Sequence, residues 1–281
     1  MALFFGRKKT PELVVLAENI FKAPVKLPLG LKRKLNTLNF EECWALIKKV
    51  SLDLDHLKAR SLVRFLFAEQ AEQVRAQLEN KTEIKTAIFC LQYLPAPETV
   101  QALVNLLNQH EKVIQLQAAE ALKNQPPRLV VPVLIEKLLK NEIPPARAGE
   151  ALMAMGHLAQ DALLDAYQQA SPEAKVQVLE LLIISQNPKC ERFLSEALAS
   201  ENINLKRAAL KAISVFLFRD FWPKVVECLK DSPWPIKVKS LQVLTRFRVG
   251  EAKEVVRPLL EDEDPWVRQA AQKYFTILEL E

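Results

Sequence analysis

Residues that could carry out catalysis or bind a metal are scattered through this sequence. His56, His110 and His157 lie far apart, and none has a carboxylate or cysteine at metal-ligand spacing, as in the HExxH pattern. The nucleophile-elbow, dinucleotide-binding and phosphate-loop patterns GxSxG, GxGxxG and GKS/T do not occur either. We therefore predict no catalytic residues, no cofactor, no metal site and no enzymatic activity.

The cysteines and the N-terminus bear on where the protein works. Cys43, Cys90, Cys190 and Cys228 form no CxxC pair, so we expect buried thiols in a reducing compartment. No apolar run reaches the roughly 18–20 residues that span a bilayer. In residues 1–9 the charges follow the apolar residues, the reverse of a secretory signal. We expect a cytoplasmic protein, with peripheral membrane association left open.

The elements that would position any functional side chain are predicted to be helices. Only 5 of the 281 residues are glycine, and 49% are hydrophobic. Ala, Leu, Lys, Glu and Gln, which favour helices, are abundant, and few stretches alternate apolar and polar residues as a half-buried strand would. The composition therefore favours an all-α protein.

An internal repeat of 29 to 31 residues organises most of the chain. Apolar residues recur in one register that we assign to the first helix of each unit: Cys43, Val74, Leu103, Leu134, Leu163, Leu194, Val225 and Val256. A second register marks the second helices: Leu62, Leu91, Leu122, Leu152, Leu182, Ile213, Leu244 and Phe275. Each register has a companion position at helical spacing, for example Leu260 four residues after Val256 and Pro144 eight residues before Leu152. Stacked helical pairs would bury these stripes against one another.

The repeat predicts two regions. Residues 40–281 are expected to form an α-α superhelix, or solenoid, of about eight helical pairs. Residues 1–39 are expected to form a basic segment with a short capping helix from about Thr10 to Lys22 and a connector. This segment is where the basic character lies, because residues 1–40 carry a net charge of +6 and the remaining 241 residues a net charge of −1.

The last unit, VVRPLLEDEDPWVRQAAQ, resembles a HEAT repeat. The matching residues are Pro258, Leu259, Leu260, Asp262, Asp264, Val267, Arg268, Ala270 and Ala271. The period is similar to that of the short bacterial HEAT repeat also found in phycobilin lyases. The resemblance implies that turn acids support cations along the stack in the C-terminal half, which here would join Asp231 and Asp262 to Lys175, Lys206, Lys237 and Arg268. It implies no particular activity, since this repeat hosts many functions.

In HEAT solenoids the second helices line the concave face, which is the usual contact surface. With about 100° per residue, positions three and six after Ile114 and its equivalents fall on a more exposed side of the helix. This rule places Ala208 on the exposed side. It also predicts a concave face that is acidic and amide-rich in its middle and basic in its C-terminal third. The predicted partner-binding residues are Gln117, Glu120, Arg147, Glu150, Gln177, Glu180, Arg207, Lys211, Lys239 and Arg246. We expect Trp234 and Trp266 at inter-helix turns, outside this lining, so a similarity to HEAT-like DNA glycosylases is not carried over.

The favoured function is a non-catalytic scaffold that binds a protein or peptide partner on the concave face. The partner would be basic where it contacts the middle of the concave face and acidic where it contacts the C-terminal end of that face. One alternative is a solvated face in which Glu120 or Glu150 pairs with Arg147. A second is nucleic-acid binding through the basic N-terminal and C-terminal surfaces, and a third is an accessory subunit of an enzyme such as a bilin lyase.

The N-terminus also suggests weak membrane contact. Apolar residues precede cations there, and an anionic membrane attracts cations with about 1 kcal/mol each. The predicted membrane-contact residues are Leu3, Phe4, Phe5, Arg7, Lys8 and Lys9, with Lys32–Lys34 further along. The alternative is a frayed basic terminus next to a helix that caps the first repeat.

Overall fold

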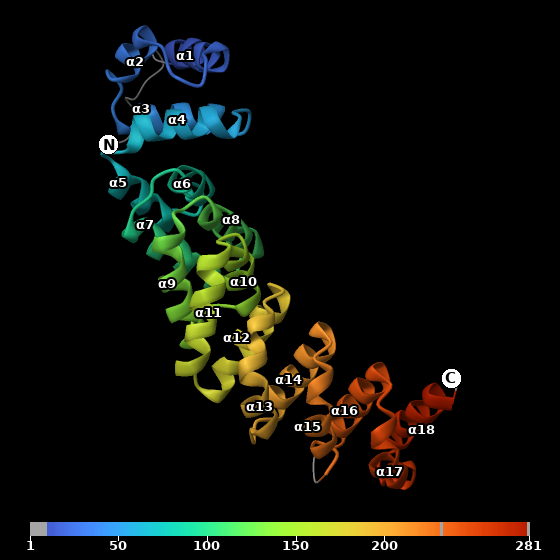
Figure 1. Cartoon of the computed structure of the whole chain (residues 1–281). Coiled ribbons are helices and arrows are strands. Elements are labelled where there is room, and N and C mark those ends of the chain that lie inside the picture. Colours follow the sequence, from blue (N-terminus) through green and yellow to red (C-terminus); the bar gives the residue numbers. More distant parts are fainter. Residues whose placement is uncertain (1–9, 231–232, 280–281) are drawn as a thin grey trace. The chain divides into compact units, whose positions relative to one another are not determined.

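The computed structural model describes residues 10–230 and 233–279, and every regular element among them is a helix (Figure 1). The all-α prediction is confirmed, and the fold is a helical repeat of the α-α superhelix class. By their contacts the helices divide into two compact units: residues up to 134 with 146–155, and residues 135–145 with 156 onward. No helix in the described ranges is long and apolar enough to cross a membrane.

The first unit opens with two helices that precede the repeat. These are α1 (Thr10–Lys22), which packs against α3, and the short helix α2 (Leu29–Leu35). Helical pairs follow, and α9 extends into the second unit. Their elements are α3 (Phe40–Val50), α4 (His56–Phe67), α5 (Ala71–Ala76), η1 (Gln77–Glu79), α6 (Ile84–Leu91), α7 (Pro97–Asn105), η2 (Leu106–Asn108), α8 (Lys112–Lys123), α9 (Pro127–Leu139) and α10 (Pro145–Met153), where η denotes a 3₁₀ helix.

The second unit continues the same alternation of first and second helices. Its second helices pack in sequence, α12 against α14, α14 against α16 and α16 against α18. The elements are α11 (His157–Gln169), α12 (Pro172–Ile184), η3 (Pro188–Cys190), α13 (Glu191–Ala199), α14 (Ile203–Phe216), η4 (Arg219–Phe221), α15 (Trp222–Glu227), α16 (Trp234–Phe247), η5 (Gly250–Ala252), α17 (Lys253–Val256), η6 (Arg257–Glu261) and α18 (Pro265–Glu279). The described elements of both units give eight pairs after α2, as the repeat predicts.

Side-chain caps fix several helix starts. Asn39 and Glu42 form a reciprocal capping box at α3, and the side chains of Asp55, Ser171 and Asn202 accept backbone N–H groups at α4, α12 and α14. These caps satisfy N–H groups that have no partner within the helix. The local sequence thus sets where many of the helices begin.

The ends of three second helices repeat one backbone feature. Gln186, Leu217 and Arg248 each adopt a left-handed conformation, with φ of 53°, 58° and 52°. The next residue then donates its N–H to the carbonyl of Leu182, Ile213 or Leu244, respectively. This is the Schellman pattern, which satisfies a carbonyl at the helix end and turns the chain toward the next unit.

Both predicted registers are buried. Every first-helix register residue from Cys43 to Val256 is at most 3% exposed, and the second-helix register is equally buried from Leu62 to Leu244. Four register predictions are wrong. Leu260 is exposed, Pro144 and Phe275 are only half-buried, and Ala208, which was expected on the exposed side, is buried.

Local geometry explains these four errors. Leu260 lies in η6, where about 120° per residue replaces the α-helical step and rotates it away from the Val256 stripe. Ile143 is buried in place of Pro144, and Tyr274 in place of Phe275. Ala208 is buried because α14 packs against both α12 and α16.

Candidate functional site

The predicted acidic residues of the first unit pair with cations on their own helices. On α8, Glu120 pairs with Lys123 at 2.7 Å. On α10, Glu150 pairs with Arg147 at 2.6 Å. Of the two ion pairs considered for a solvated face, the one between Glu150 and Arg147 is present. Gln117 is half-buried beside them. Local cations therefore offset much of the negative charge expected here.

The acidic residue of the second unit is also paired. Glu180 on α12 lies 3.7 Å from Lys211 on α14, so this pair joins two successive second helices. Gln177 Nε2 donates to Asn141 Oδ1 at 2.6 Å and is thereby held near the end of α9. Exposed ion pairs of this kind stabilise little, because water already solvates both charges. These residues are poor candidates for a strongly charged contact surface.

A cavity of about 740 Å³ lies on the second helices of the second unit. It is formed by α14, α16 and α18, and we call it the C-terminal groove. Its lining residues are Ser214, Val238, Lys239, Gln242, Val243, Thr245, Arg246, Trp266, Gln269, Ala270 and Lys273. Of the predicted partner-binding residues, the groove contains Lys239 and Arg246, whereas Arg207 and Lys211 are not part of its lining.

The groove is positively charged. Lys239, Arg246 and Lys273 contribute cations, and no Asp or Glu occurs among the lining residues that the structure describes. Lys239 Nζ makes one long hydrogen bond, 3.5 Å to Gln242 Oε1. Within residues 10–230 and 233–279 none of the three cations forms an ion pair. Cations without a carboxylate around an open cavity favour a negatively charged ligand.

Trp266 gives the groove an exposed aromatic side chain. Its side chain is 61% exposed, although it lines the cavity. The expectation that no tryptophan belongs to the second-helix lining is therefore wrong. Asp264 caps α18 and Pro265 is its first residue, so Trp266 already lies in the first helical turn. The Asp-Pro pair in the sequence is the signal that places the helix start there.

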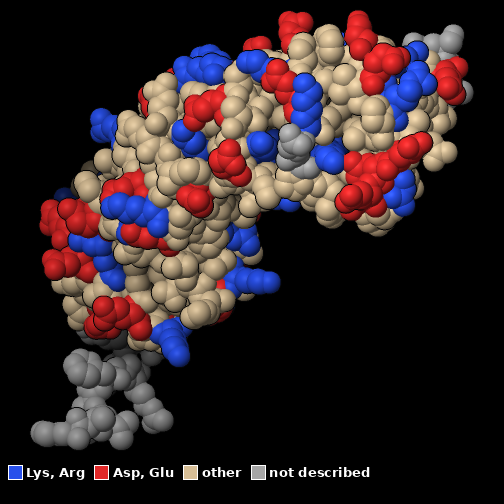
Figure 2. Space-filling view, turned by 90° about the horizontal axis from the view of Figure 1, so that it is seen from below, with Lys and Arg blue, Asp and Glu red and all other residues tan. Residues whose placement is uncertain are grey.

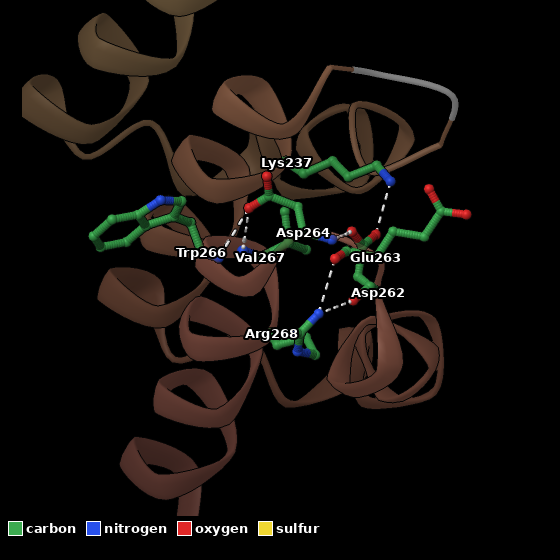
Figure 3. A network of polar contacts seen from close by, with 7 residues as sticks. All are labelled: Lys237, Asp262, Glu263, Asp264, Trp266, Val267 and Arg268. Atoms are coloured by element: carbon green, nitrogen blue, oxygen red, sulfur yellow. Dashed lines mark hydrogen bonds and ion pairs between the residues drawn. The ribbon is translucent and has the colours of Figure 1, made fainter.

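A polar network holds this first turn in place (Figure 3). Asp264 Oδ1 accepts the backbone N–H of Trp266 at 2.8 Å and that of Val267 at 3.3 Å. Arg268 Nη1 donates to the carbonyl oxygens of Asp262 at 2.7 Å and Glu263 at 2.9 Å. Hydrogen bonds between residues close in the sequence therefore fix the turn and the start of α18 on both sides of Trp266.

An ion pair ties the same network to the preceding repeat. Lys237 Nζ on α16 lies 2.8 Å from Asp262 Oδ2, and Oδ1 of the same carboxylate accepts the N–H of Asp264 at 3.0 Å (Figure 3). Burial raises the pKa of Asp262, but these two hydrogen bonds, together with the charges of Lys237 and Arg268, outweigh it and hold the pKa below its usual value. The expected support between a turn acid and a cation is present here. The equivalent residue Asp231 lies outside the described residues.

Elsewhere the titratable residues are dispersed. His110 and His157 are exposed, and His56 Nδ1 lies 3.2 Å from the hydroxyl of Tyr93. The described part of the chain contains no group of three or more His, Cys, Asp or Glu side chains able to hold a metal ion. All four cysteines are buried and free, as predicted. Burial raises the pKa of the Cys43 and Cys190 thiols to about 11, which makes them poor nucleophiles.

The fold is that of an all-α helical-repeat protein, and the C-terminal groove is lined by cations and amide side chains. No family model matches the sequence, and no curated protein matches it. Among solved structures, an engineered protein is 17% identical, with 95% of this chain and 88% of that chain covered and a TM-score of 0.39. A chain from the complex of CpcE and CpcF of phycocyanin lyase from Nostoc sp. is 16% identical, with 100% and 97% covered and a TM-score of 0.30. Human deoxyhypusine hydroxylase is 16% identical, with 96% and 97% covered and a TM-score of 0.24.

Proposed function

We propose that this protein is a non-catalytic scaffold of the short HEAT type, and that its C-terminal groove binds an acidic segment of a protein partner. One observation carries the proposal. Three cations and an exposed tryptophan line a cavity of about 740 Å³ that has no carboxylate among its described lining residues. The sequence alone predicted a binding surface along all the second helices and a partner with both basic and acidic parts. The proposal now concerns only the last three second helices and an acidic partner segment.

The groove has the side chains that peptide recognition needs. Gln242 and Gln269 each offer a donor and an acceptor to a peptide backbone, and Ser214 adds a hydroxyl group. The Thr245 hydroxyl donates to the carbonyl of Leu241 and can still accept a hydrogen bond. Tryptophan and arginine, which both line the groove, are among the residue types that most often dominate binding energy at protein interfaces. The partner segment we expect therefore combines Asp or Glu with an apolar side chain that packs on Trp266.

Surface charge favours a short acidic segment over a long nucleic acid. Figure 2 shows acidic and basic side chains interspersed over one face of the molecule. A nucleic acid would need a continuous row of cations to follow its phosphates. The groove has three lining cations on two neighbouring helices, so it suits a ligand whose negative charges span only a few residues.

Matched variants test the proposal. Trp266→Ala and Lys239→Glu change the groove. Trp234→Ala and Lys253→Glu make the same changes at exposed positions outside its lining. We expect each groove variant to lower the affinity for a fluorescent peptide of glutamate and leucine by about tenfold or more, as loss of an interface anchor does. The two control variants should bind like the wild type.

Two outcomes would contradict the proposal. One is an equal loss of binding in groove and control variants. The other is tighter binding of a single-stranded oligonucleotide than of the peptide, with affinity falling steeply between about 50 and 200 mM salt. The same four variants can be tested against a native partner recovered by affinity purification. The two groove variants should bind it more weakly, and the two control variants should bind it like the wild type.

A further inference from the structure

The described N-terminal part of the chain carries a second basic surface, distinct from the groove. No acid occurs between Glu18 and Glu41, whereas this stretch contains five cations: Lys22, Lys26, Lys32, Arg33 and Lys34. All of these except Lys32 are exposed, and Lys32 lies over the ring of Phe65. The surface therefore has one sign of charge over the end of α1, the following turn and α2.

Apolar side chains project from the middle of this basic surface. Leu29 is 72% exposed and Val25 is 43% exposed, and Phe21 next to them is also exposed. An exposed leucine on its own is ordinary, but here the apolar side chains and four exposed cations share one short segment, from the end of α1 through the turn to α2. Such a turn combines the two features that hold a protein on a charged bilayer.

The local structure forces these side chains outward. Ala23 and Leu27 are buried, so Val25 between them is exposed. Leu31 and Leu35 form the buried side of α2, which leaves Leu29 on the other side. Pro24 and Pro28 have no N–H group and keep the turn from continuing as a helix. Lys58 Nζ on α4 donates to the carbonyl of Phe21 at 2.9 Å and ties the end of α1, just before the turn, to the first repeat.

A hollow lies beside the apolar side chains. It has a volume of about 410 Å³, and Asn19, Lys22, Gly30 and Lys34 are among the residues that line it. Its described lining contains two cations and no carboxylate. A side-chain Cβ added at Gly30 would meet nothing within 4 Å, so the hollow is open at this point. This space and charge suit a phosphate group.

We infer that this surface, residues 19–34, docks on an anionic lipid bilayer. Val25 and Leu29 enter the boundary between headgroups and acyl chains, while Lys22 and Lys34 hold a lipid phosphate at the hollow. A bilayer matches the surface because it presents negative charge and apolar chains together, whereas a nucleic acid has no acyl chains to take up Leu29. The predicted membrane-contact residues from Leu3 to Lys9 lie outside the described residues.

Vesicle co-sedimentation of the full chain tests the inference. We expect binding to vesicles with about 30 mol% phosphatidylserine and little binding to phosphatidylcholine alone, because each cation near the surface adds about fivefold in affinity. Leu29→Ser should lower binding by about tenfold, since the leucine side chain would no longer enter the membrane. Leu52→Ser is the matched control, because Leu52 is 93% exposed between α3 and α4.

Two double variants distinguish phosphate binding at the hollow from general electrostatic attraction to the membrane. The double variant Lys22→Ala and Lys34→Ala should lose more binding than Lys49→Ala and Lys85→Ala, which remove the same charge at exposed positions of the same unit. Circular dichroism and thermal unfolding check that each variant is folded. The inference is overturned by equal binding to both kinds of vesicle, or by equal losses in the two double variants. It is also overturned if Leu29→Ser binds like Leu52→Ser, or if an oligonucleotide binds more tightly than the anionic vesicles.

Discussion

Lys237 Nζ lies 2.8 Å from Asp262 Oδ2, and this ion pair joins α16 to the turn before α18. The Asp262 side chain is 10% exposed and that of Lys237 is 23% exposed, so both are largely shielded from water. The same carboxylate accepts the N–H of Asp264, whose own side chain caps the helix that presents Trp266. A contact between repeats thereby helps to position the C-terminal groove.

Replacement of Asp262 by alanine should destabilise the last repeat. The substitution removes two hydrogen bonds to a charged acceptor, so we expect a loss of about 1–3 kcal/mol in the free energy of unfolding, measured with urea. Asp165→Ala, at an exposed position on α11, is the control and should change stability much less. Equal losses of stability in the two variants would show that the Asp262 carboxylate stabilises the fold no more than an exposed carboxylate does.

The same carboxylate should make stability depend on pH in the acid range. Its pKa is lower in the folded than in the unfolded protein, where it is near the ordinary value of 3.8, so the folded state binds fewer protons. The stabilisation is therefore complete above about pH 5 and is lost as the pH falls through the folded pKa. Urea unfolding at a series of pH values should show a difference between wild type and Asp262→Asn that shrinks on acidification. A difference that stays constant would contradict this, and Asp165→Asn controls for the loss of one carboxylate.

Two buried tyrosines should respond differently to loss of the hydroxyl. The Tyr274 hydroxyl donates to the carbonyl of Val249, so Tyr274→Phe should lower stability by about 1–2 kcal/mol. The Tyr167 hydroxyl is buried without a hydrogen-bond partner among the described residues, so Tyr167→Phe should be neutral or stabilise by about 1 kcal/mol. The Tyr167 ring would keep its stacking on Phe193, at 4.1 Å between centroids. Thermal unfolding of the two variants measures the change in melting temperature, and equal changes would contradict the prediction.

The helix end at Leu217 should favour glycine. Its φ of 58° is left-handed, which costs a residue with a Cβ about 1–2 kcal/mol relative to the right-handed conformation. Leu217→Gly should therefore be more stable than Leu217→Ala by about 1 kcal/mol, because both remove the same contacts but only glycine removes the strain. Urea unfolding measures the difference, and a more stable alanine variant would show that the strain is absent in solution.

The repeat could be predicted from the sequence because burial in a stacked helical pair demands apolar side chains at fixed spacing. Residues such as Leu103, Leu194 and Leu244 are buried in the structure, and their spacing alone marked them. Leu260 shows where such reasoning ends. The change from an α-helix to a 3₁₀ helix at η6 rotates it out of the stripe, and spacing does not reveal that change.

The candidate site depended on the tertiary structure to a much greater degree. Lys239 and Arg246 could be placed on a second helix from the sequence, but Trp266, Gln269 and Lys273 join them only because α18 packs beside α16. The structure also decided which cation pairs with Glu120, Glu150 and Glu180, and for Glu180 that cation, Lys211, lies on the next second helix. The sequence by itself determined the repeat and its buried stripes, because they follow from a period along one chain. The groove needed the tertiary structure, because its charge and volume arise from side chains on different helices.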